Sequence, residues 1–323
     1  MRYIGNKENI LENIYTILQA NNVSGKTFFD FFAGTTNVGR FFKSKNYQVS
    51  SSDILYLSYC LQKAYIENNS EPKFEKLLKI LPESNNKSLF STPLETVSNY
   101  LNSLDGVEGF IFQNYTPAGT KELQQPRMYF IDENGKKIDA IRQQIENWKN
   151  DNLISESEYY VLLTSLIETI GFYSNIAGVY AAFHKHWDFR ALRPLELRTI
   201  QFVDNGKENI VYNDDSMNLL DKINVDILYL DPPYNERQYA PNYHILETIA
   251  KYDEPKLRGV TGMRDYSSQK SRFCNPTTAL EDLNKIAKEA KYNFLVLSYN
   301  SEGIMPSEKI IETLKQYGSV KLE

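Results

Sequence analysis

The stretch "TFFDFFAGTTNVG" at Thr27–Gly39 decides the fold. Its first six residues form an apolar run broken by one aspartate, which is typical of a buried strand, and Gly34 and Gly39 bracket a turn that opens a helix. A second short strand, "YQVSSSDI", ends near Asp53, and the next helix is predicted over Leu55–Asn68. Strands that alternate with helices in this way predict a parallel sheet.

This alternation stops near residue 70 and returns after residue 197. The chain between these positions is rich in Asn, Ser and aromatic residues, and its apolar residues have helical spacing. Strand-like runs then reappear as "ENIVYNDD", "VDILYLDPPY" and "FLVLSYN". We therefore predict an α/β fold, with a doubly wound, mostly parallel Rossmann-like sheet built from 1–69 and 198–323. A mainly helical domain is inserted over 70–197.

The composition limits the class of protein. The chain has 323 residues with 41% hydrophobic content, and it contains no run of the roughly 20 apolar residues that a membrane span requires. The first ten residues lack the apolar core of a signal peptide, so a cytoplasmic location and no membrane partner are expected. Cys60 and Cys274 lack metal-ligand spacing, and "HKHWDFR" at His184–Arg190 offers two histidines without a third ligand. We therefore expect no metal.

Basic residues gather in two segments of an otherwise acidic chain. The formal net charge of −5 argues mildly against binding to nucleic acid. Between residues 256 and 272, however, five basic residues accompany one aspartate, and between 190 and 198 three arginines accompany one glutamate. Both segments are predicted to face DNA, and a solvated basic surface is the alternative. Gly259 and Gly262 predict that the first segment is mobile without DNA.

Acidic residues stand at or just past four predicted strand ends, namely Asp30, Asp53, Asp215 and Asp231. In doubly wound sheets, ligands bind beyond the carboxyl ends of the strands, where the strand order reverses. A single aspartate in such a place is common in turns and helix caps. Four of them predict a polar ligand site at this edge of the sheet.

The glycine loop after the first strand does not fit a phosphate. Arg40 and Phe41 stand where a P-loop requires Lys and Ser/Thr, and Thr36 stands where a dinucleotide fold has its second glycine. A glycine loop without a phosphate grip suits an uncharged nucleoside, and Asp53 is placed to bind ribose hydroxyls. S-adenosylmethionine meets both demands. The alternative is a tight turn in which Asp53 is only a helix cap.

The run "DPPY" at Asp231–Tyr234 indicates chemistry on an exocyclic amine of a base. The Asp231 carboxylate and the Pro232 carbonyl can accept the two N–H groups of the amine, which turns its lone pair toward a sulfonium methyl group. Tyr234 can stack on a base that has been flipped out of the duplex. The two prolines fix the backbone, so the acceptors are pre-organised.

The chain resembles the alpha-type N6-adenine DNA methyltransferases, the group that includes the DNA adenine methyltransferase. The closest resemblance is to the FokI-type modification methyltransferases. The motifs that carry it appear in the family's order: "RYIGNK" at Arg2–Lys7, "DFFAGTTNVGRFF" at Asp30–Phe42, "NDDSM" at Asn213–Met217, "DPPYNERQYAPNYHILETIA" at Asp231–Ala250 and "LSYNSEG" at Leu297–Gly303.

The resemblance implies a site-specific DNA adenine N6-methyltransferase of a restriction-modification system, in which 70–197 is the target-recognition domain. It implies double-stranded DNA as partner, with a cognate endonuclease as a genetic partner only. Residues expected around S-adenosylmethionine are Tyr3, Lys7, Asp30, Gly34, Asp53 and Asp215, while Asp231, Pro232 and Tyr234 hold the adenine. Residues expected at the DNA, from "RQYAPNYH" in the resemblance and from the two basic segments, are Arg237, Tyr239, Tyr243, Lys256, Arg258, Arg264, Lys270, Arg272, Arg190 and Arg193.

Two departures from the family accompany these expectations. Thr36 replaces a glycine that is common in the cofactor loop, and the chain ends at "GSVKLE", where relatives continue, so a truncated or processed form is expected. A methyltransferase acting on RNA or on a protein amide is the alternative enzyme, although such enzymes usually have Asn at the start of the Pro-Pro-Tyr turn. The non-enzymatic alternative is a DNA-binding subunit that has lost catalysis.

Overall fold

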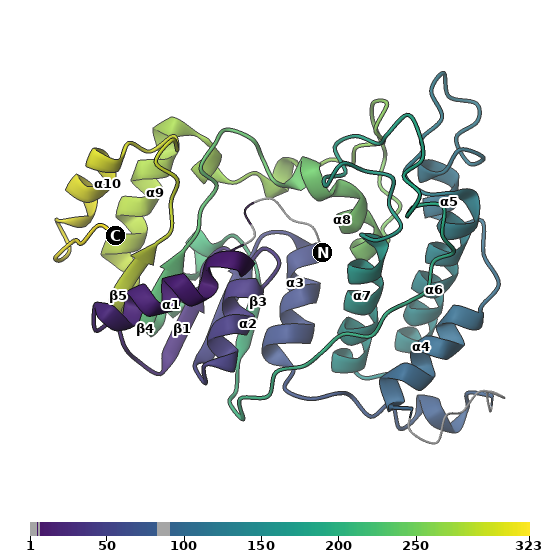
Figure 1. The fold of residues 1–323 in the computed structure, drawn as a ribbon, viewed down its shortest axis with the longest axis horizontal. Coiled ribbons are helices and arrows are strands. Elements are labelled where there is room, and N and C mark those ends of the chain that lie inside the picture. Colours follow the sequence, from purple (N-terminus) through teal and green to yellow (C-terminus); the bar gives the residue numbers. More distant parts are fainter. Residues whose placement is uncertain (1–4, 6, 83–90) are drawn as a thin grey trace. The chain divides into compact units, whose positions relative to one another are not determined.

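A computed structural model describes every residue of the chain except 1–4, 6 and 83–90. The chain divides into two compact units, labelled by element in Figure 1. The sheet unit comprises Gly5–Asn69, Val203–Ala240 and Tyr266–Glu323, and the helical unit comprises Ser70–Phe202 and Pro241–Asp265. Among the described residues, no helix has the length and hydrophobicity needed to cross a membrane.

The sheet unit contains one five-stranded sheet in the order β3-β2-β1-β4-β5. Its strands are β1 (Thr27–Asp30), β2 (Gln48–Asp53), β3 (Ile210–Asn213), β4 (Asn224–Leu230) and β5 (Lys291–Leu297). Every neighbouring pair is parallel. The predicted α/β fold with a parallel sheet is therefore confirmed.

Both faces of the sheet are buried, which explains why the strands read as continuous apolar runs. Side chains alternate between the faces along a strand. Phe28 and Ile227 accordingly join one core, in which Phe42 and Val49 are also buried. Phe29 and Leu228 join the core on the other face.

Helices cover the two faces of the sheet. The first core packs against α1 (Leu11–Ala20) and α2 (Asn37–Ser44), and the second packs against α9 (Pro276–Glu289) and α10 (Ser307–Leu314). The other helical elements of this unit are η1 (Glu8–Ile10), α3 (Tyr56–Gln62), η2 (Lys63–Glu67), η4 (Ser216–Lys222), η6 (Ser267–Gln269) and η7 (Arg272–Cys274). The sheet is thus a middle layer between two helical layers, as Figure 1 shows.

The helical unit is built around a long helix, α6 (Asp132–Asn150). The unit also contains η3 (Leu77–Lys79), α4 (Pro93–Ser103), α5 (Phe110–Tyr115), α7 (Glu156–Ile170) and α8 (His244–Lys251), while η5 (Ala240–Tyr243) leads into α8. Both α4 and α7 begin with a capping box, made by Thr92 with Glu95 and by Ser155 with Glu158. These pairs satisfy backbone N–H groups that have no partner inside the helix.

A buried arginine of α6 binds the end of α8. The Arg142 side chain is 2% exposed, and its Nε and Nη2 donate to the carbonyls of Ile249 and Ala250 at 3.0 and 3.2 Å. Its Nη1 donates to Glu146 at 2.8 Å. The last carbonyls of α8 therefore find a charged donor across a long sequence separation. Residues 241–265 consequently group with the insertion, although the sequence assigned them to the sheet part. The roles expected of the two parts stay predictions.

We expect Arg142→Ala to lower the free energy of unfolding by about 3 kcal/mol, because it leaves the buried carbonyls of Ile249 and Ala250 without their donor and removes the ion pair with Glu146. Urea denaturation followed by circular dichroism measures the change. The control is Lys149→Ala on the same helix. Lys149 lies 4.0 Å from Glu146, and its side chain is 45% exposed, so its loss should have an effect of about 0.5–1 kcal/mol. Equal losses in the two variants would show that Arg142 does not stabilise α8.

Candidate active site

The direction in which strands are added to the sheet reverses between β1 and β4. The chain passes outward from β1 to β2 and β3, and β4 then returns to the other side of β1, followed by β5. Asp30, the last residue of β1, is in register with Tyr229 of β4. Asp30 and Asp231 therefore stand at the carboxyl ends of adjacent parallel strands, where ligands bind in doubly wound sheets.

Asp231 forms an ion pair with Lys7. The Nζ atom of Lys7 lies 3.1 Å from Oδ1 of Asp231, and about a fifth of each side chain is exposed. Burial raises the pKa of Asp231 to about 6, and the charge and hydrogen bond of Lys7 oppose the rise. The sequence placed Lys7 with the cofactor residues. The structure brings it to the carboxylate that begins the "DPPY" run.

Asp30 is a buried carboxylate. Its side chain is 1% exposed, and neither of its oxygens has a hydrogen-bond partner among the described residues. Burial raises the pKa of Asp30 to about 8. The negative charges of Asp231 and Asp53 add to the rise, and the N–H dipoles of Gly39 and Phe32, which lie nearby without hydrogen-bond geometry, oppose it. Buried polar atoms without partners are rare in proteins, and functional sites are one place where they persist. This carboxylate is therefore a candidate ligand contact.

The glycine loop is fixed by Asp53 at the end of β2. Oδ2 of Asp53 accepts the Gly34 amide at 2.8 Å, and Oδ1 accepts the Leu55 amide at 2.9 Å at the start of α3. The Gly34 carbonyl accepts the Ser58 hydroxyl at 2.7 Å, and Gly34 has a positive φ of 49°. Asp53 therefore fixes the glycine loop and the start of α3, which is the structural role that the sequence analysis kept as an alternative. A contact of Asp53 with ribose stays a prediction.

Thr36 has a backbone conformation that favours glycine. Its φ is 65°, its side chain is fully buried, and its hydroxyl donates to the Thr35 carbonyl at 2.5 Å. A positive φ is a conformational outlier for a β-branched residue. Thr36, which stands where the family commonly has a glycine, therefore has a backbone conformation that favours glycine, and this conformation is strained. It lies at the start of α2, next to the candidate ligand site.

Backbone hydrogen bonds fix the turn after β4 at both of its ends. The Leu230 carbonyl accepts the Ser298 amide at 2.9 Å, and the Tyr234 carbonyl accepts the Ile304 amide at 3.0 Å. Pro232 is buried, and in the described part of the chain no backbone N–H reaches its carbonyl. This carbonyl remains an available acceptor beside the Asp231 carboxylate.

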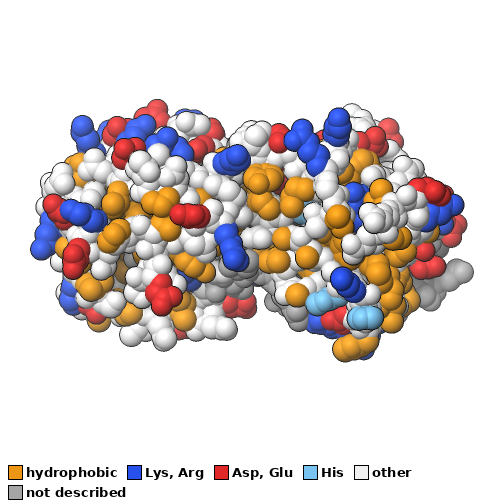
Figure 2. Space-filling view, turned by 90° about the horizontal axis from the view of Figure 1, so that it is seen from above, with side chains coloured by type: hydrophobic (Ala, Val, Ile, Leu, Met, Phe, Trp, Pro, Cys, Tyr) orange, Lys and Arg blue, Asp and Glu red, His pale blue; other side chains and the backbone are white. Residues whose placement is uncertain are grey.

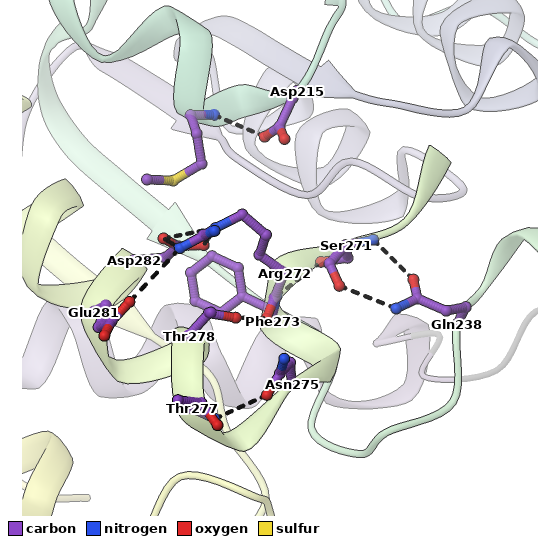
Figure 3. A network of polar contacts seen from close by, with 11 residues as sticks. Asp215, Gln238, Ser271, Arg272, Phe273, Asn275, Thr277, Thr278, Glu281 and Asp282 are labelled. Carbon is purple, nitrogen blue, oxygen red and sulfur yellow. Dashed lines mark hydrogen bonds and ion pairs between the residues drawn. The ribbon is translucent and has the colours of Figure 1, made fainter. Parts of the chain in front are cut away.

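Gln238 is a positioning residue that the sequence did not reveal. Its side-chain amide donates to the Ser271 carbonyl at 3.0 Å and accepts the Ser271 amide at 2.7 Å, as Figure 3 shows. The Cys274 thiol donates to the Arg237 carbonyl at 3.4 Å. These bonds attach the segment after Tyr234 to η7. Gln238 lies within the "RQYAPNYH" motif, but that motif does not indicate these two bonds, because their partner is a backbone group far away in the sequence.

Asp215 and Tyr3 are the two other residues expected at the cofactor, and the structure describes only the first. Asp215 caps η4 by accepting the Met217 amide at 3.0 Å, a bond visible in Figure 3. Its position after β3 agrees with the predicted strand end, and its contact with a cofactor stays a prediction. Tyr3 lies outside the described residues. No group of three His, Cys, Asp or Glu side chains suited to a metal occurs in the described ranges.

Four residues expected at the DNA are buried or form ion pairs within the protein, which the sequence did not indicate. Tyr243 is fully buried, and Arg264 is 7% exposed and binds both carboxylate oxygens of Asp253. Both side chains therefore have structural positions rather than surface ones. Arg190 pairs with Asp188 at 2.5 Å, and Arg272 pairs with Asp282 and Glu281 (Figure 3). Their guanidinium groups are already engaged within the protein.

The other expected DNA contacts lie at the surface. Exposed residues of this group are Arg193, Arg237, Lys256, Arg258 and Lys270, and Tyr239 is half-buried. On the face drawn in Figure 2, basic and acidic side chains are interspersed, as the net charge of −5 leads one to expect. DNA binding by these residues stays a prediction.

A family comparison agrees with this geometry. Residues 3–313 match the model of the D12 class N6 adenine-specific DNA methyltransferases. The chain belongs to this family. The predicted membership, made from the order of its motifs, is confirmed. No solved structure is significantly similar to this D12 class chain.

Curated relatives of the chain are named type II methyltransferases or modification methylases. The chain is 44% identical to type II methyltransferase M.FokI of Planomicrobium okeanokoites over 98% of this chain and 47% of that protein. It is 41% identical to modification methylase StsI of Streptococcus sanguinis, over 98% and 46%. It is 39% identical to type II methyltransferase M.NlaIII of Neisseria lactamica, over 100% and 90%. The chain thus spans about half the length of the first two relatives and most of the third.

The strain at Thr36 can be tested by comparing two truncations. At ordinary helical positions Gly is less stable than Ala by up to about 1 kcal/mol. We expect the reverse at this position, with Thr36→Gly more stable than Thr36→Ala by about 1 kcal/mol, because only Ala retains the Cβ that makes the left-handed conformation costly. Both variants lose the same buried atoms beyond Cβ. Thermal unfolding of the two proteins side by side decides the order, and a more stable Ala variant would refute the strain.

Proposed function

We propose that the chain is an adenine-specific DNA N6-methyltransferase of a type II restriction-modification system. The observation that carries the proposal is the pair of acceptors at the point where the strand order reverses, namely the Asp231 carboxylate and the Pro232 carbonyl. Membership of the D12 class and the names of the relatives support the reaction. Its partner is double-stranded DNA, its place is the cytoplasm, and its cognate endonuclease is a genetic partner.

The residues at the strand ends fit S-adenosylmethionine. This cofactor carries a sulfonium and an ammonium group, and the unpartnered carboxylate of Asp30 supplies two acceptors of the opposite charge. Gly34 leaves the loop without a side chain on the ligand side, and Asp53 and Asp215 add carboxylates at the neighbouring strand ends. Bound there, the cofactor would supply an electrophilic methyl group. The resemblance adds Tyr3 to this set.

The catalytic residues act on the exocyclic nitrogen of adenine. Oδ1 of Asp231 is held by Lys7, and no described residue donates a hydrogen bond to Oδ2, so Oδ2 can accept one N–H of the amine while the Pro232 carbonyl accepts the other. Two such bonds pull the nitrogen toward a tetrahedral shape and free its lone pair for attack. Tyr234 stacks on the flipped base. Lys7 is a positioning residue, because it orients Asp231 and favours its ionised form.

We expect Asp231→Ala to lower the rate of methyl transfer by about 10²–10³-fold, the usual effect of removing one pre-organised polar contact. Its dissociation constant for S-adenosylmethionine should stay within about tenfold of the wild-type value, because Asp231 acts on the base. Single-turnover transfer to a duplex and calorimetry with the cofactor measure the two quantities. Asp221→Asn, which removes an exposed carboxylate, is the control. Unchanged turnover in Asp231→Ala would refute the mechanism.

The pH dependence gives a second test of the same residue. The pKa of Asp231 is raised to about 6, so the ionised acceptor is lost as the pH falls through about 6, and the wild-type rate should fall with it. Asp231→Asn keeps an oxygen acceptor and removes the titration. It should retain more activity than Asp231→Ala and show no decline near pH 6. A decline that persists in Asp231→Asn would assign it to another group.

A further inference from the structure

A tight hairpin follows α8 in the helical unit. The backbones of Arg258 and Met263 exchange two hydrogen bonds of 2.9 Å. Gly259 and Gly262 have φ values of 68° and 67°, which allow the chain to reverse between them. The Val260 side chain is 56% exposed at the tip. The sequence predicted that this segment is mobile, but the structure ties its tip to the body of the unit.

The tie is the guanidinium of Arg127. Its Nε donates to the Val260 carbonyl at 2.9 Å, and its Nη2 donates to the Gly259 carbonyl at 3.1 Å. Nη1 donates to the Asn114 carbonyl at 2.9 Å, so the side chain is shared between the hairpin and α5. The Tyr115 hydroxyl donates to the Gly262 carbonyl at 2.9 Å. The hairpin is therefore held from behind by two buried side chains.

The charge of Arg127 is not neutralised by a neighbour. The residue is 7% exposed, and burial lowers its pKa. Among the described residues no carboxylate lies within ion-pair distance of it, whereas the nearby Arg264 is paired with Asp253. A buried cation bound only to carbonyls is expensive unless its charge has a use. Its positive potential extends through the hairpin toward solvent.

The geometry of the peptide bond then fixes where the amides of the tip point. In a planar trans peptide, the N–H is directed opposite to the preceding C=O. Because the carbonyls of Gly259 and Val260 point inward to Arg127, the N–H groups of Val260 and Thr261 point away from it. Over the described part of the chain, neither amide has a hydrogen-bond acceptor. Two adjacent donors therefore face outward, with a buried cation behind them.

The surroundings suit an anion. From Pro255 to Met263 the segment contains Lys256 and Arg258, and its flanking carboxylates are Glu254, Asp265 and Asp253, the last of which is paired with Arg264. Both basic side chains are exposed. Consecutive outward N–H groups form the kind of concavity that binds phosphate oxygens, and a cation behind aligned peptide groups strengthens them as donors.

We propose that the hairpin 258–263 is a phosphate-binding loop, in which the amides of Val260 and Thr261 bind one phosphate of the DNA backbone. This rests on the proposed function for the identity of the ligand. The loop would position the duplex without reading its sequence, as backbone contacts do. It also gives an acidic protein a phosphate contact that does not depend on the number of surface cations.

The first experiment measures DNA affinity on duplexes in which one phosphate at a time is replaced by an uncharged methylphosphonate. We expect the wild-type protein to lose about tenfold in affinity at one position near the target site. Val260→Pro removes one amide donor without changing the charge, and should bind the unmodified duplex about tenfold more weakly. It should lose nothing further at that position. Val260→Ala keeps the amide and should keep the position-specific loss.

Two outcomes would overturn the proposal in this experiment. One is equal affinity profiles for Val260→Pro and Val260→Ala, and the other is a Val260→Pro protein that still loses affinity at every position where the wild type does. Melting temperatures of the two variants show that both are folded. Arg127→Met provides an independent variant, and it should weaken the contact at the same phosphate.

The second experiment uses the unaltered protein and no DNA. Inorganic phosphate is titrated into the ¹⁵N-labelled chain, with chloride of equal ionic strength as control, and the amide resonances are followed. Saturable shifts of Val260 and Thr261 are expected with phosphate and not with chloride. If these two amides do not move, the loop is not an anion site. If they move but the wild-type protein fails to bind DNA, the proposed function is wrong and the anion site stands.

Discussion

The parallel pairing of β1 with β4 is the constraint on which the candidate site depends. It places the carboxyl ends of two strands from distant parts of the sequence beside each other, and each of these ends carries an aspartate. The other contacts of the site act on these two carboxylates or on the segments that follow them. Lys7 pairs with one carboxylate, and Asp53 fixes the glycine loop that follows the other in sequence. The amides of Ser298 and Ile304 hold the turn around Asp231, and Gln238 attaches the segment after Tyr234 to η7. The helices and cores on both faces keep the two strands adjacent.

The helical unit depends on a different device, which is the binding of backbone carbonyls by buried guanidinium groups. Arg142 binds the last carbonyls of α8, and Arg127 binds the tip of the hairpin that follows it. A planar guanidinium presents several donors in fixed directions, so one side chain can satisfy two or three acceptors from separate segments. Residues 241–265 are thereby built into the unit that contains the insertion.

The sequence predicted the elements whose signals are local. The run at Thr27–Gly39 carries a strand, a turn and a helix start within thirteen residues, and the "DPPY" run carries its chemistry in four. Contacts between distant segments left no such signal. The sequence did not indicate that Arg142 binds carbonyls of α8 or that Gln238 binds Ser271, because these partners are backbone groups far away in the sequence. The same limit explains Arg264 and Tyr243, which have the residue types of a DNA contact and the burial of a core. The charge and type of a residue suggest a role, but only the fold shows whether its side chain reaches the surface.

The electrostatics of the two strand-end carboxylates distinguish their roles. A buried carboxylate and a partly buried one in proximity cannot both ionise cheaply, so the surroundings decide which one keeps its charge. Lys7 lies on Asp231 and holds its pKa near 6, whereas the pKa of Asp30, which has no such partner, rises to about 8. The surroundings therefore favour the charge on Asp231 over the charge on Asp30. A cationic ligand beside Asp30 would favour its ionised form, as Lys7 favours that of Asp231. In the proposed reaction, Asp231 accepts an N–H group of the base and Asp30 offers its carboxylate to a cationic cofactor.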